Sequence, residues 1–209
     1  MRQMLIQLHP DNPDPRRMAQ VIEELKRDGV VIVPTDTVYA FACALGSSKG
    51  LDALAKIKGV KPEKANFSLI CKDLSEVAAY TKPLANEVFK IMRRALPGPY
   101  TFILEASGQV PKIFRGNKKT IGIRVPDHGA TLALVEALGS PLLVTSVHDD
   151  DDVMEYTTDP ELIHERWGDR CAAVVDGGLG HLEASTVIDC TDGVPEVVRE
   201  GLGPVDSLL

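Results

Sequence analysis

The sequence has no apolar run that approaches the ~20 residues needed to cross a bilayer, and its cysteines are few and scattered. The first five residues show no apolar segment of the secretory kind. No C-x-x-C pair occurs among the cysteines, which are Cys43, Cys71, Cys171 and Cys190. We therefore expect a cytoplasmic protein with reduced, buried thiols and no membrane partner.

Several signatures of catalysis and nucleotide binding are also missing. Neither G-x-x-x-x-G-K-[ST] nor G-x-G-x-x-G occurs, which excludes an ordinary P-loop or dinucleotide-binding fold. H-E-x-x-H does not occur, and the five histidines lack the spacing of metal ligands. We therefore expect no metal site built from histidine.

The charge of the chain limits the partners it can have. A formal net charge of −7 argues against wrapping by nucleic acid but leaves room for a local basic groove. Lysines at 56, 58, 61 and 64 place four cations within nine residues, which suits an anionic ligand. The alternative is a solvated basic loop at a helix end. The acidic run Asp149–Asp152 suits Mg²⁺ bound through phosphates, and its alternative is a solvated acidic loop.

The 209 residues have an ordinary globular composition, 44% hydrophobic and 25% charged, and we expect residues 1–209 to form one domain. Strand and helix patterns alternate irregularly, which favours a mixed sheet with helices on both faces. Strands are predicted at residues 4–8, 30–33, 41–45, 67–71, 100–104, 120–125, 142–145, 172–175, 186–188 and 197–199. Helices are predicted at residues 15–28, 48–58, 74–80, 83–96, 131–138 and 160–167.

One stretch organises the rest of the chain, Val30-Val31-Ile32-Val33-Pro34 followed by Thr35-Asp36-Thr37. Four β-branched apolar residues in a row are typical of a strand buried on both faces, and Pro34 ends it because proline cannot donate to a sheet ladder. The three polar side chains then lie past the carboxyl end of a strand, where such sheets bind ligands. The alternative is a polar turn in which Asp36 binds its own backbone.

Other predicted strands also end in, or are flanked by, a small polar residue or an arginine, and these ends could converge on one crevice. Arg124, at the end of an apolar strand, suits either a buried ion pair or an anion clamp. The residues at these ends are Thr35, Thr37, Thr101, Arg124, Ser146, Ser185 and Arg199.

Seven blocks of the chain, in order, resemble the YrdC/YciO family and span nearly the whole sequence. Pro34–Tyr39 is similar to the family's P-T-[DE]-T-x-Y opening. The other six blocks are Lys56–Gly59, Pro97–Thr101 (the P-G-P-x-T turn), Ile121–Pro126 (the arginine strand), Asp176–Gly178, Ser185–Asp189 and Val198–Gly201. His9–Pro13 adds a likeness to the YciO branch.

The resemblance implies an α+β, three-layer α/β/α fold with a twisted mixed sheet and a concave, locally positive cavity. It also implies a nucleotidyltransferase activity of the threonylcarbamoyl-AMP synthase type, which uses threonine, bicarbonate and ATP and serves threonylcarbamoyladenosine formation in tRNA. A carbamate oxygen attacks the α-phosphate in that reaction, so the protein needs charge and alignment rather than a nucleophile. We expect no permanently bound cofactor, ATP as a substrate, and Mg²⁺ only with its phosphates.

The resemblance also assigns roles to the polar residues at the strand ends. ATP and phosphate binding falls to Lys58, Lys61, Arg124, Ser146, Ser185 and Arg199. Amino-acid binding falls to Thr35, Thr37 and Thr101. No side chain receives a catalytic role.

Two blocks depart from the synthase pattern. The synthases carry K-x-R where this chain has Lys58-Gly59-Val60, and S-x-N where it has Ser146-Val147-His148. We therefore expect nucleotide binding with weak or absent synthase activity, since Lys61 lacks the bidentate fork of arginine. The alternatives are a non-catalytic protein that binds double-stranded RNA or tRNA through its basic residues, and a scaffold for an unrelated metabolite.

Overall fold

The computed structural model describes residues 4–62, 67–114, 119–147, 158–206 and 208. Its strands are β1 (Met4–Gln7), β2 (Val31–Val33), β3 (Ala40–Ala44), β4 (Ser68–Ile70), β5 (Tyr100–Glu105), β6 (Thr120–Arg124), β7 (Leu142–Ser146), β8 (Ala173–Asp176), β9 (Thr186–Asp189) and β10 (Glu196–Arg199). Its helices are α1 (Pro15–Lys26), α2 (Ser48–Ile57), α3 (Leu74–Tyr80), α4 (Asn86–Ala95), α5 (Gly129–Leu138) and α6 (Pro160–Trp167).

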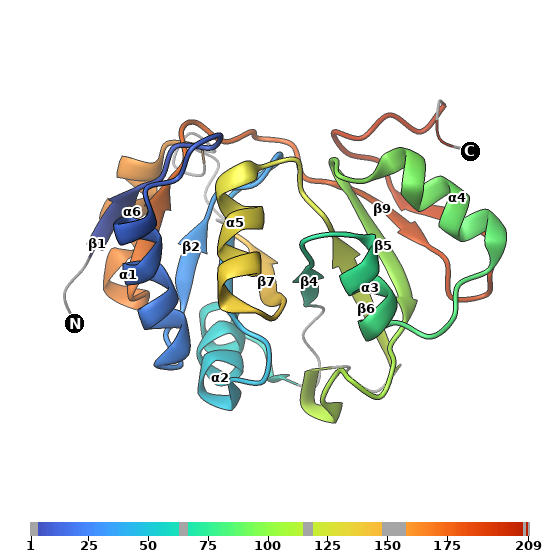
Figure 1. Ribbon diagram of the computed structural model, residues 1–209, viewed down its shortest axis with the longest axis horizontal. Helices are drawn as coiled ribbons and strands as arrows, with labels where there is room; N and C mark the ends of the chain where they lie inside the picture. Colours follow the sequence, from blue (N-terminus) through green and yellow to red (C-terminus); the bar gives the residue numbers. More distant parts are fainter. Residues whose placement is uncertain (1–3, 63–66, 115–118, 148–157, 207, 209) are drawn as a thin grey trace.

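These ten strands form one sheet in the order β1-β8-β2-β3-β7-β4-β6-β5-β9-β10 (Figure 1). β8 runs parallel to both β1 and β2, β4 to β6, and β5 to β9. The remaining neighbours are antiparallel. Neighbouring strands in sheets usually turn by roughly 20–25° on one another, and these turns add up over the ten strands of this sheet. The predicted mixed sheet is confirmed.

Two hydrophobic clusters cover the two faces of the sheet, because side chains alternate along a strand. Val31 and Val33 belong to one cluster, which α1 and α5 cover. Ile32 belongs to the other, which includes residues of α2, α3, α4 and α6. All three β2 side chains are 0% exposed, so the strand predicted at residues 30–33 is confirmed as buried.

Local signals fix most helix ends where the sequence predicts them. Asp14 caps α1 through the backbone N–H groups of Arg16 and Arg17, and Pro15 occupies the first helical position. Ser47 and Asp159 cap α2 and α6 in the same way. Gly139 ends α5 with a left-handed φ of 75°, a conformation that glycine adopts without strain.

One predicted helix starts later than expected. The sequence pattern places its start at Pro83, whereas α4 begins at Asn86. Thr81 forms an isolated β-bridge with Ala106, and the Lys82 N–H donates to the Glu105 carbonyl, so both residues are held in an extended connection before the helix. Ala85 then precedes α4 without a side-chain cap.

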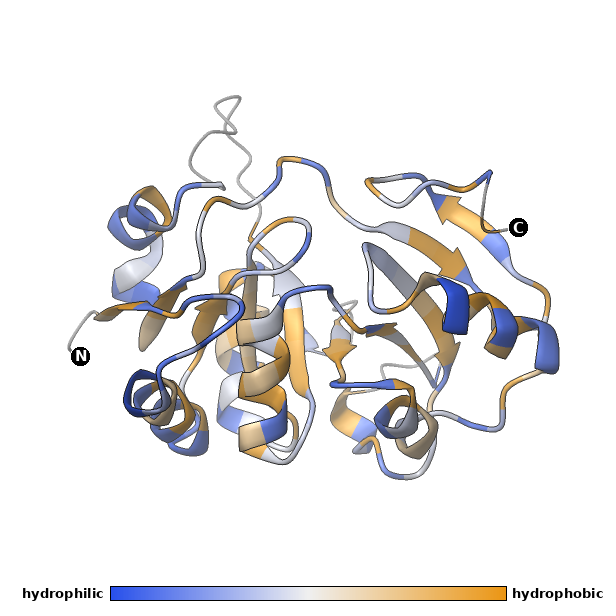
Figure 2. Cartoon of the chain, turned by 45° about the horizontal axis from the view of Figure 1, so that its top comes forward, coloured by the Kyte–Doolittle hydropathy of each residue, from blue (hydrophilic) through white to orange (hydrophobic). Residues whose placement is uncertain are grey.

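The hydropathy of the chain matches this layered arrangement. Figure 2 shows strands that are mostly hydrophobic and helices with one hydrophobic and one hydrophilic side. Among the described residues, every helix is too short or too polar to cross a membrane.

Candidate functional site

The turn after β2 is built from its own two threonines. The Thr35 hydroxyl donates to the Val38 carbonyl at 2.8 Å, and it accepts from the Thr37 N–H at 3.1 Å. The two hydroxyl oxygens lie 3.1 Å apart. Both residues are buried, so the turn is a fixed part of the structure rather than a solvated loop.

Asp36, between the two threonines, binds an arginine that is distant in sequence. Arg124 Nη2 donates to Asp36 Oδ1 at 2.7 Å and to the Thr37 hydroxyl at 2.9 Å. Asp36 Oδ2 accepts from the Asp127 N–H at 3.0 Å. Asp36 therefore ties the turn after β2 to the end of β6, in place of the local backbone bond that the turn interpretation requires.

The Arg124–Asp36 pair is buried, with side chains 7% and 9% exposed. Burial lowers the pKa of Arg124 from its ordinary value, the charge of Asp36 raises it, and nearby Arg199 lowers it again. Among the described residues, the buried Nε of Arg124 has no hydrogen-bond partner. The pair thus places one guanidinium against one carboxylate, with the guanidinium of Arg199 nearby and with one donor, Nε of Arg124, that lacks an acceptor among the described residues.

A second chain of polar contacts lies on β5, β9 and β10. The hydroxyl oxygens of Thr101 and Ser185 are 2.7 Å apart, and Arg199 Nη2 donates to the Ser185 carbonyl at 2.8 Å. The register of β10 shifts between Val197 and Arg199, an irregularity of the kind that redirects side chains. Gly201 permits this close approach, because a Cβ there would lie 2.3 Å from the Ala184 carbonyl oxygen.

Lys58 forms a third group beside the end of β7. Its Nζ donates to the hydroxyl of Thr145 at 2.9 Å, next to exposed Ser146. Lys58 is exposed as a whole residue, but its ammonium group lies against the sheet, and this partial burial lowers its pKa. Ser146 pairs with Ala40, which pairs with Val33, so this group lies two strands, or about 10 Å, from β2.

The structure thus arranges the predicted site residues in three groups. Thr37 binds Arg124 and contacts Thr35, while Ser185 binds Arg199 and contacts Thr101. The two arginines are close enough to interact electrostatically. Lys58 binds Thr145, the neighbour of Ser146 on β7, and Lys61 is exposed in the turn beyond α2. Whether all of them line one ligand cavity stays a prediction.

Three contacts at this site lack a sequence signal. Thr145 lies inside an apolar strand and contributes only its hydroxyl. Asp127 contributes a backbone N–H, which any residue except proline could supply. Tyr39 donates to the Gly178 carbonyl at 2.6 Å, which joins the opening motif to a turn 139 residues away.

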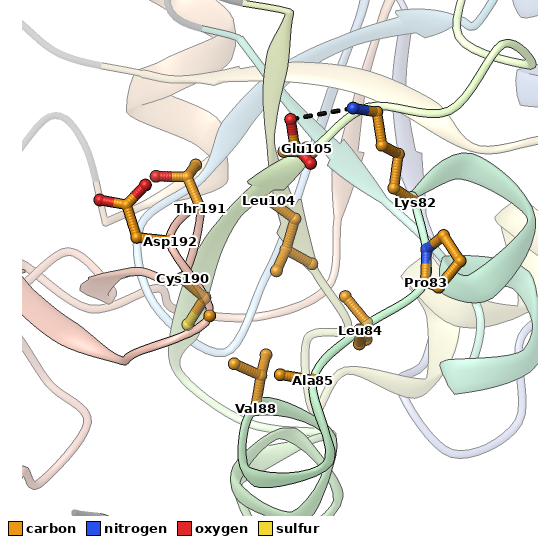
Figure 3. Close-up of a pocket in the computed structure, with 11 residues that line it drawn as sticks. Lys82, Pro83, Leu84, Ala85, Val88, Leu104, Glu105, Cys190, Thr191 and Asp192 are labelled. Atoms are coloured by element: carbon orange, nitrogen blue, oxygen red, sulfur yellow. Dashed lines mark hydrogen bonds and ion pairs between the residues drawn. The ribbon is translucent and has the colours of Figure 1, made fainter.

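One cavity, of about 250 Å³, lies away from these groups, between the start of α4, the end of β5 and the turn after β9 (Figure 3). Leu84, Val88 and Leu104 form its apolar floor, and the Lys82–Glu105 ion pair lies at its rim. Burial raises the pKa of the Cys190 thiol to about 12, so this lining cysteine is protonated and unreactive at neutral pH.

The described residues hold no group of three or more histidine, cysteine, aspartate or glutamate side chains that could bind a metal ion. The run Asp149–Asp152, the sequence candidate for Mg²⁺, lies outside them. His128 is half-buried, and burial lowers its pKa.

Comparison with known proteins gives consistent matches over this whole arrangement. The family model for Sua5, YciO and YrdC, described as "Telomere recombination", matches residues 23–201. The protein YciO of Escherichia coli K12 is 39% identical over 204 residues, 97% of each chain. Its crystal structure superposes with a TM-score of 0.90 over 99% of each chain, at 38% identity.

Two further relatives extend the match. A threonylcarbamoyl-AMP synthase of Halorhodospira halophila is 31% identical over 179 residues, 86% of this chain and 92% of the relative. The structure of P. abyssi Sua5 with L-threonine has a TM-score of 0.86 at 22% identity, over 98% of this chain and 59% of that one, which is a likeness of fold.

Proposed function

The chain belongs to the Sua5, YciO and YrdC family, and on that premise we propose that it binds an adenine nucleotide at the groups around Arg124 and Arg199, in a site of the threonylcarbamoyl-AMP synthase type. The observation that carries the proposal is the buried Nε of Arg124, which has no acceptor among the described residues. A buried donor without a partner is costly, and the group is cationic. A phosphate oxygen is the acceptor that a guanidinium binds best.

Charge supports the same ligand. Arg124 and Arg199 lie near each other, and one carboxylate, that of Asp36, pairs with Arg124. Asp36 already accepts from Arg124 and from the Asp127 N–H, so both of its oxygens are engaged. The site therefore keeps an excess positive charge, which an α-phosphate neutralises.

The reaction proposed for this site needs no protein nucleophile. A carboxylate oxygen of N-carboxythreonine attacks the α-phosphorus of ATP, a new O–P bond forms, and the bond between the α-phosphorus and the bridging oxygen breaks. Pyrophosphate leaves with the bond's electron pair. Arg124, Arg199 and Lys58 stabilise the phosphate charge, and the hydroxyls of Thr35, Thr37 and Thr101 orient the amino acid.

Two departures from the synthase pattern lower the expected turnover. Val60, which is 38% exposed, stands where the synthases carry an arginine, and His148 stands where they carry an asparagine. Loss of one donor to a developing charge typically costs about 10²–10³ in rate. We therefore propose a protein that binds nucleotide well and forms the mixed anhydride slowly.

The test combines binding and turnover. Calorimetry with AMP and ATP measures binding, and pyrophosphate release is measured with and without threonine and bicarbonate. We expect binding, little threonine-dependent release, and an increase in release in the double variant Val60→Arg, His148→Asn. The single variant Ser48→Arg, at an exposed neutral residue at the start of α2, serves as a control for added guanidinium charge.

Two results would contradict the proposal in different ways. Synthase-level pyrophosphate release by the unaltered chain would mean that Val60 and His148 do not limit the reaction. No heat of binding at millimolar ATP would overturn nucleotide binding itself. The latter result would favour the RNA or unrelated-metabolite alternatives, and a salt-dependent mobility shift with double-stranded RNA separates these two.

A further inference from the structure

A second cavity, of about 380 Å³, lies beyond the ends of β1 and β8, and neither Asp36 nor Arg124 is among its lining residues. The residues that line it include Gln7, His9, Asp14, Arg17, Asp176 and Gly177. Its volume is within the ~300–1,000 Å³ range of small-molecule sites. None of these residues has a role in the proposed nucleotide site.

The topology of the chain creates this cavity. β1 and β8 are parallel and end in register, with Gln7 opposite Asp176. The chain then leaves β1 toward α1 and leaves β8 toward β9, so the two connections separate beyond the sheet. Open sheets bind ligands in such crevices, at the carboxyl ends of parallel strands.

Hydrogen bonds to the backbone hold the two carboxylates of the cavity in place and leave one oxygen of each for a ligand. Asp14 accepts the Arg16 and Arg17 N–H groups on Oδ1, and Asp176 accepts the Gly178 N–H on Oδ1. The structure gives the Oδ2 atoms no partner among the described residues. Arg17 Nη1 donates to the Gln7 carbonyl at 3.1 Å, which directs the guanidinium across the end of β1.

His9 and Gly177 complete the enclosure. His9 Nδ1 accepts from the Asp11 N–H at 3.2 Å, so the neutral ring carries its proton on Nε2 and can donate. Gly177 also lines the cavity. Glycine is required there, because a Cβ would lie 2.6 Å from the Pro34 ring and 2.9 Å from the His128 ring. The cavity therefore presents two carboxylates together with a guanidinium and an imidazole N–H.

This mixture selects one ligand chemistry. A simple anion would meet two carboxylates, and a simple cation would meet Arg17. Hydroxyl groups satisfy both kinds of wall, because each one donates to a carboxylate and accepts from a cationic or neutral N–H. Neighbouring hydroxyls can donate hydrogen bonds to a carboxylate, as ribose hydroxyls do in dinucleotide-binding sites. We infer that this cavity binds a vicinal diol of the ribose type, with Asp14 and Asp176 accepting from the hydroxyls and Arg17 donating to them.

The experiment uses the full chain labelled with ¹⁵N and the probe methyl β-D-ribofuranoside, which carries neither base nor phosphate. We expect saturable shifts of the Gly177 and Gly178 amide signals, with a Kd on the order of 1 mM. The matched 2-deoxy riboside, which lacks one hydroxyl of the diol, should bind at least about tenfold more weakly.

Two variants and one control separate this cavity from the nucleotide site. Arg17→Ala and Asp176→Asn should each weaken the riboside by about tenfold, while binding of 2′,3′-dideoxyadenosine monophosphate, which keeps the phosphate but lacks the diol, stays unchanged. Arg16→Ala, the exposed neighbour on α1 that does not line the cavity, should change neither. Equal shifts with the 2-deoxy riboside, no saturation, or no effect of Arg17→Ala would overturn the inference, whatever the outcome with ATP.

The diol can come from a free riboside or from the 3′ end of an RNA. A short oligoribonucleotide with a free 3′ diol is compared with the same oligonucleotide carrying a 3′ phosphate. Tighter binding of the free-diol form than of both the 3′-phosphate form and the methyl riboside assigns the RNA end, and equal binding of the two oligonucleotides assigns a free riboside. Both results support the diol site and identify its source.

Discussion

Arg124 and Lys58 carry the same charge and are both proposed to bind phosphate, but their surroundings in the structure differ. The Arg124 side chain is 7% exposed. It binds the carboxylate of Asp36, 88 positions away in the sequence, and the hydroxyl of Thr37, 87 positions away. Lys58 is an exposed residue at the C-cap of α2, and it binds one hydroxyl, that of Thr145. The first cation is part of the core, and the second is held near it.

The difference predicts two separate effects of removing charge. Removal of one partner from a buried ion pair leaves the other charge desolvated, so it lowers the free energy of unfolding strongly. Removal of a cation whose only described partner is a hydroxyl changes the stability little, but it takes away attraction for an anionic ligand. The same proposed function should therefore fail through folding at Arg124 and through affinity at Lys58.

The largest effect is expected from Arg124→Ala. It leaves Asp36 buried without its cation, so urea denaturation should show a loss of about 3–5 kcal/mol in the free energy of unfolding. The double variant Asp36→Leu, Arg124→Met removes both charges and should recover most of that loss. A loss below about 1 kcal/mol for the single variant would mean that the pair contributes no more than an exposed one.

A smaller loss is expected from Asp36→Asn, which keeps the shape and removes the charge. Hydrogen bonds to charged groups contribute about 1.5–3 kcal/mol, so the free energy of unfolding should fall by about 2 kcal/mol. Asp127→Asn is the matched control, because Asp127 contributes its backbone N–H and not its side chain. The two variants should be compared by the same urea titration, and equal losses would contradict the assignment.

Lys58→Met should leave the stability within about 0.5 kcal/mol of the unaltered chain. AMP affinity measured by calorimetry should weaken about tenfold, since one charge-assisted contact is lost. Lys56→Met, at an exposed lysine two residues earlier, controls for the general loss of positive charge. If both variants bind AMP alike, Lys58 attracts the nucleotide only through net charge.

The smallest effect is a pH dependence of nucleotide binding. Burial lowers the pKa of Lys58, so this ammonium loses its proton at a lower pH than an ordinary lysine does. The proton is needed to bind phosphate, so AMP affinity should fall as pH rises through that lowered pKa and should be full below it. The fall should be absent in Lys58→Met, and a profile identical in both proteins would exclude Lys58 as its cause.

Much of the fold could be predicted because local signals agree with the final arrangement. The β-branched run at Val31–Val33, the caps at Asp14 and Ser47, and the stop at Gly139 each fix an element without reference to distant residues. The order of strands in the sheet had no such signal. Neither did the late start of α4, because it depends on the bridge between Thr81 and Ala106, which joins separate parts of the chain.

The polar residues at the strand ends could be picked out from the sequence, but their contacts could not. A polar side chain at the end of an apolar strand is visible in the sequence, and Arg124 and Thr37 are such residues. That Asp36 binds Arg124 could not be seen, because ion pairing over 88 positions depends on the twist and register of the sheet. Backbone partners such as the Asp127 N–H leave no mark on residue type.

The sequence distances within the site have a consequence for how the protein forms. Asp36 and Arg124 are 88 positions apart, Thr101 and Ser185 are 84 apart, and Tyr39 and Gly178 are 139 apart. Contacts of such high order close slowly, since the loop entropy is lost before the contact is gained. During synthesis at about 5–20 residues per second, Arg199 emerges many seconds after Thr35. The nascent chain therefore lacks the proposed nucleotide site until β9 and β10 have added to the sheet.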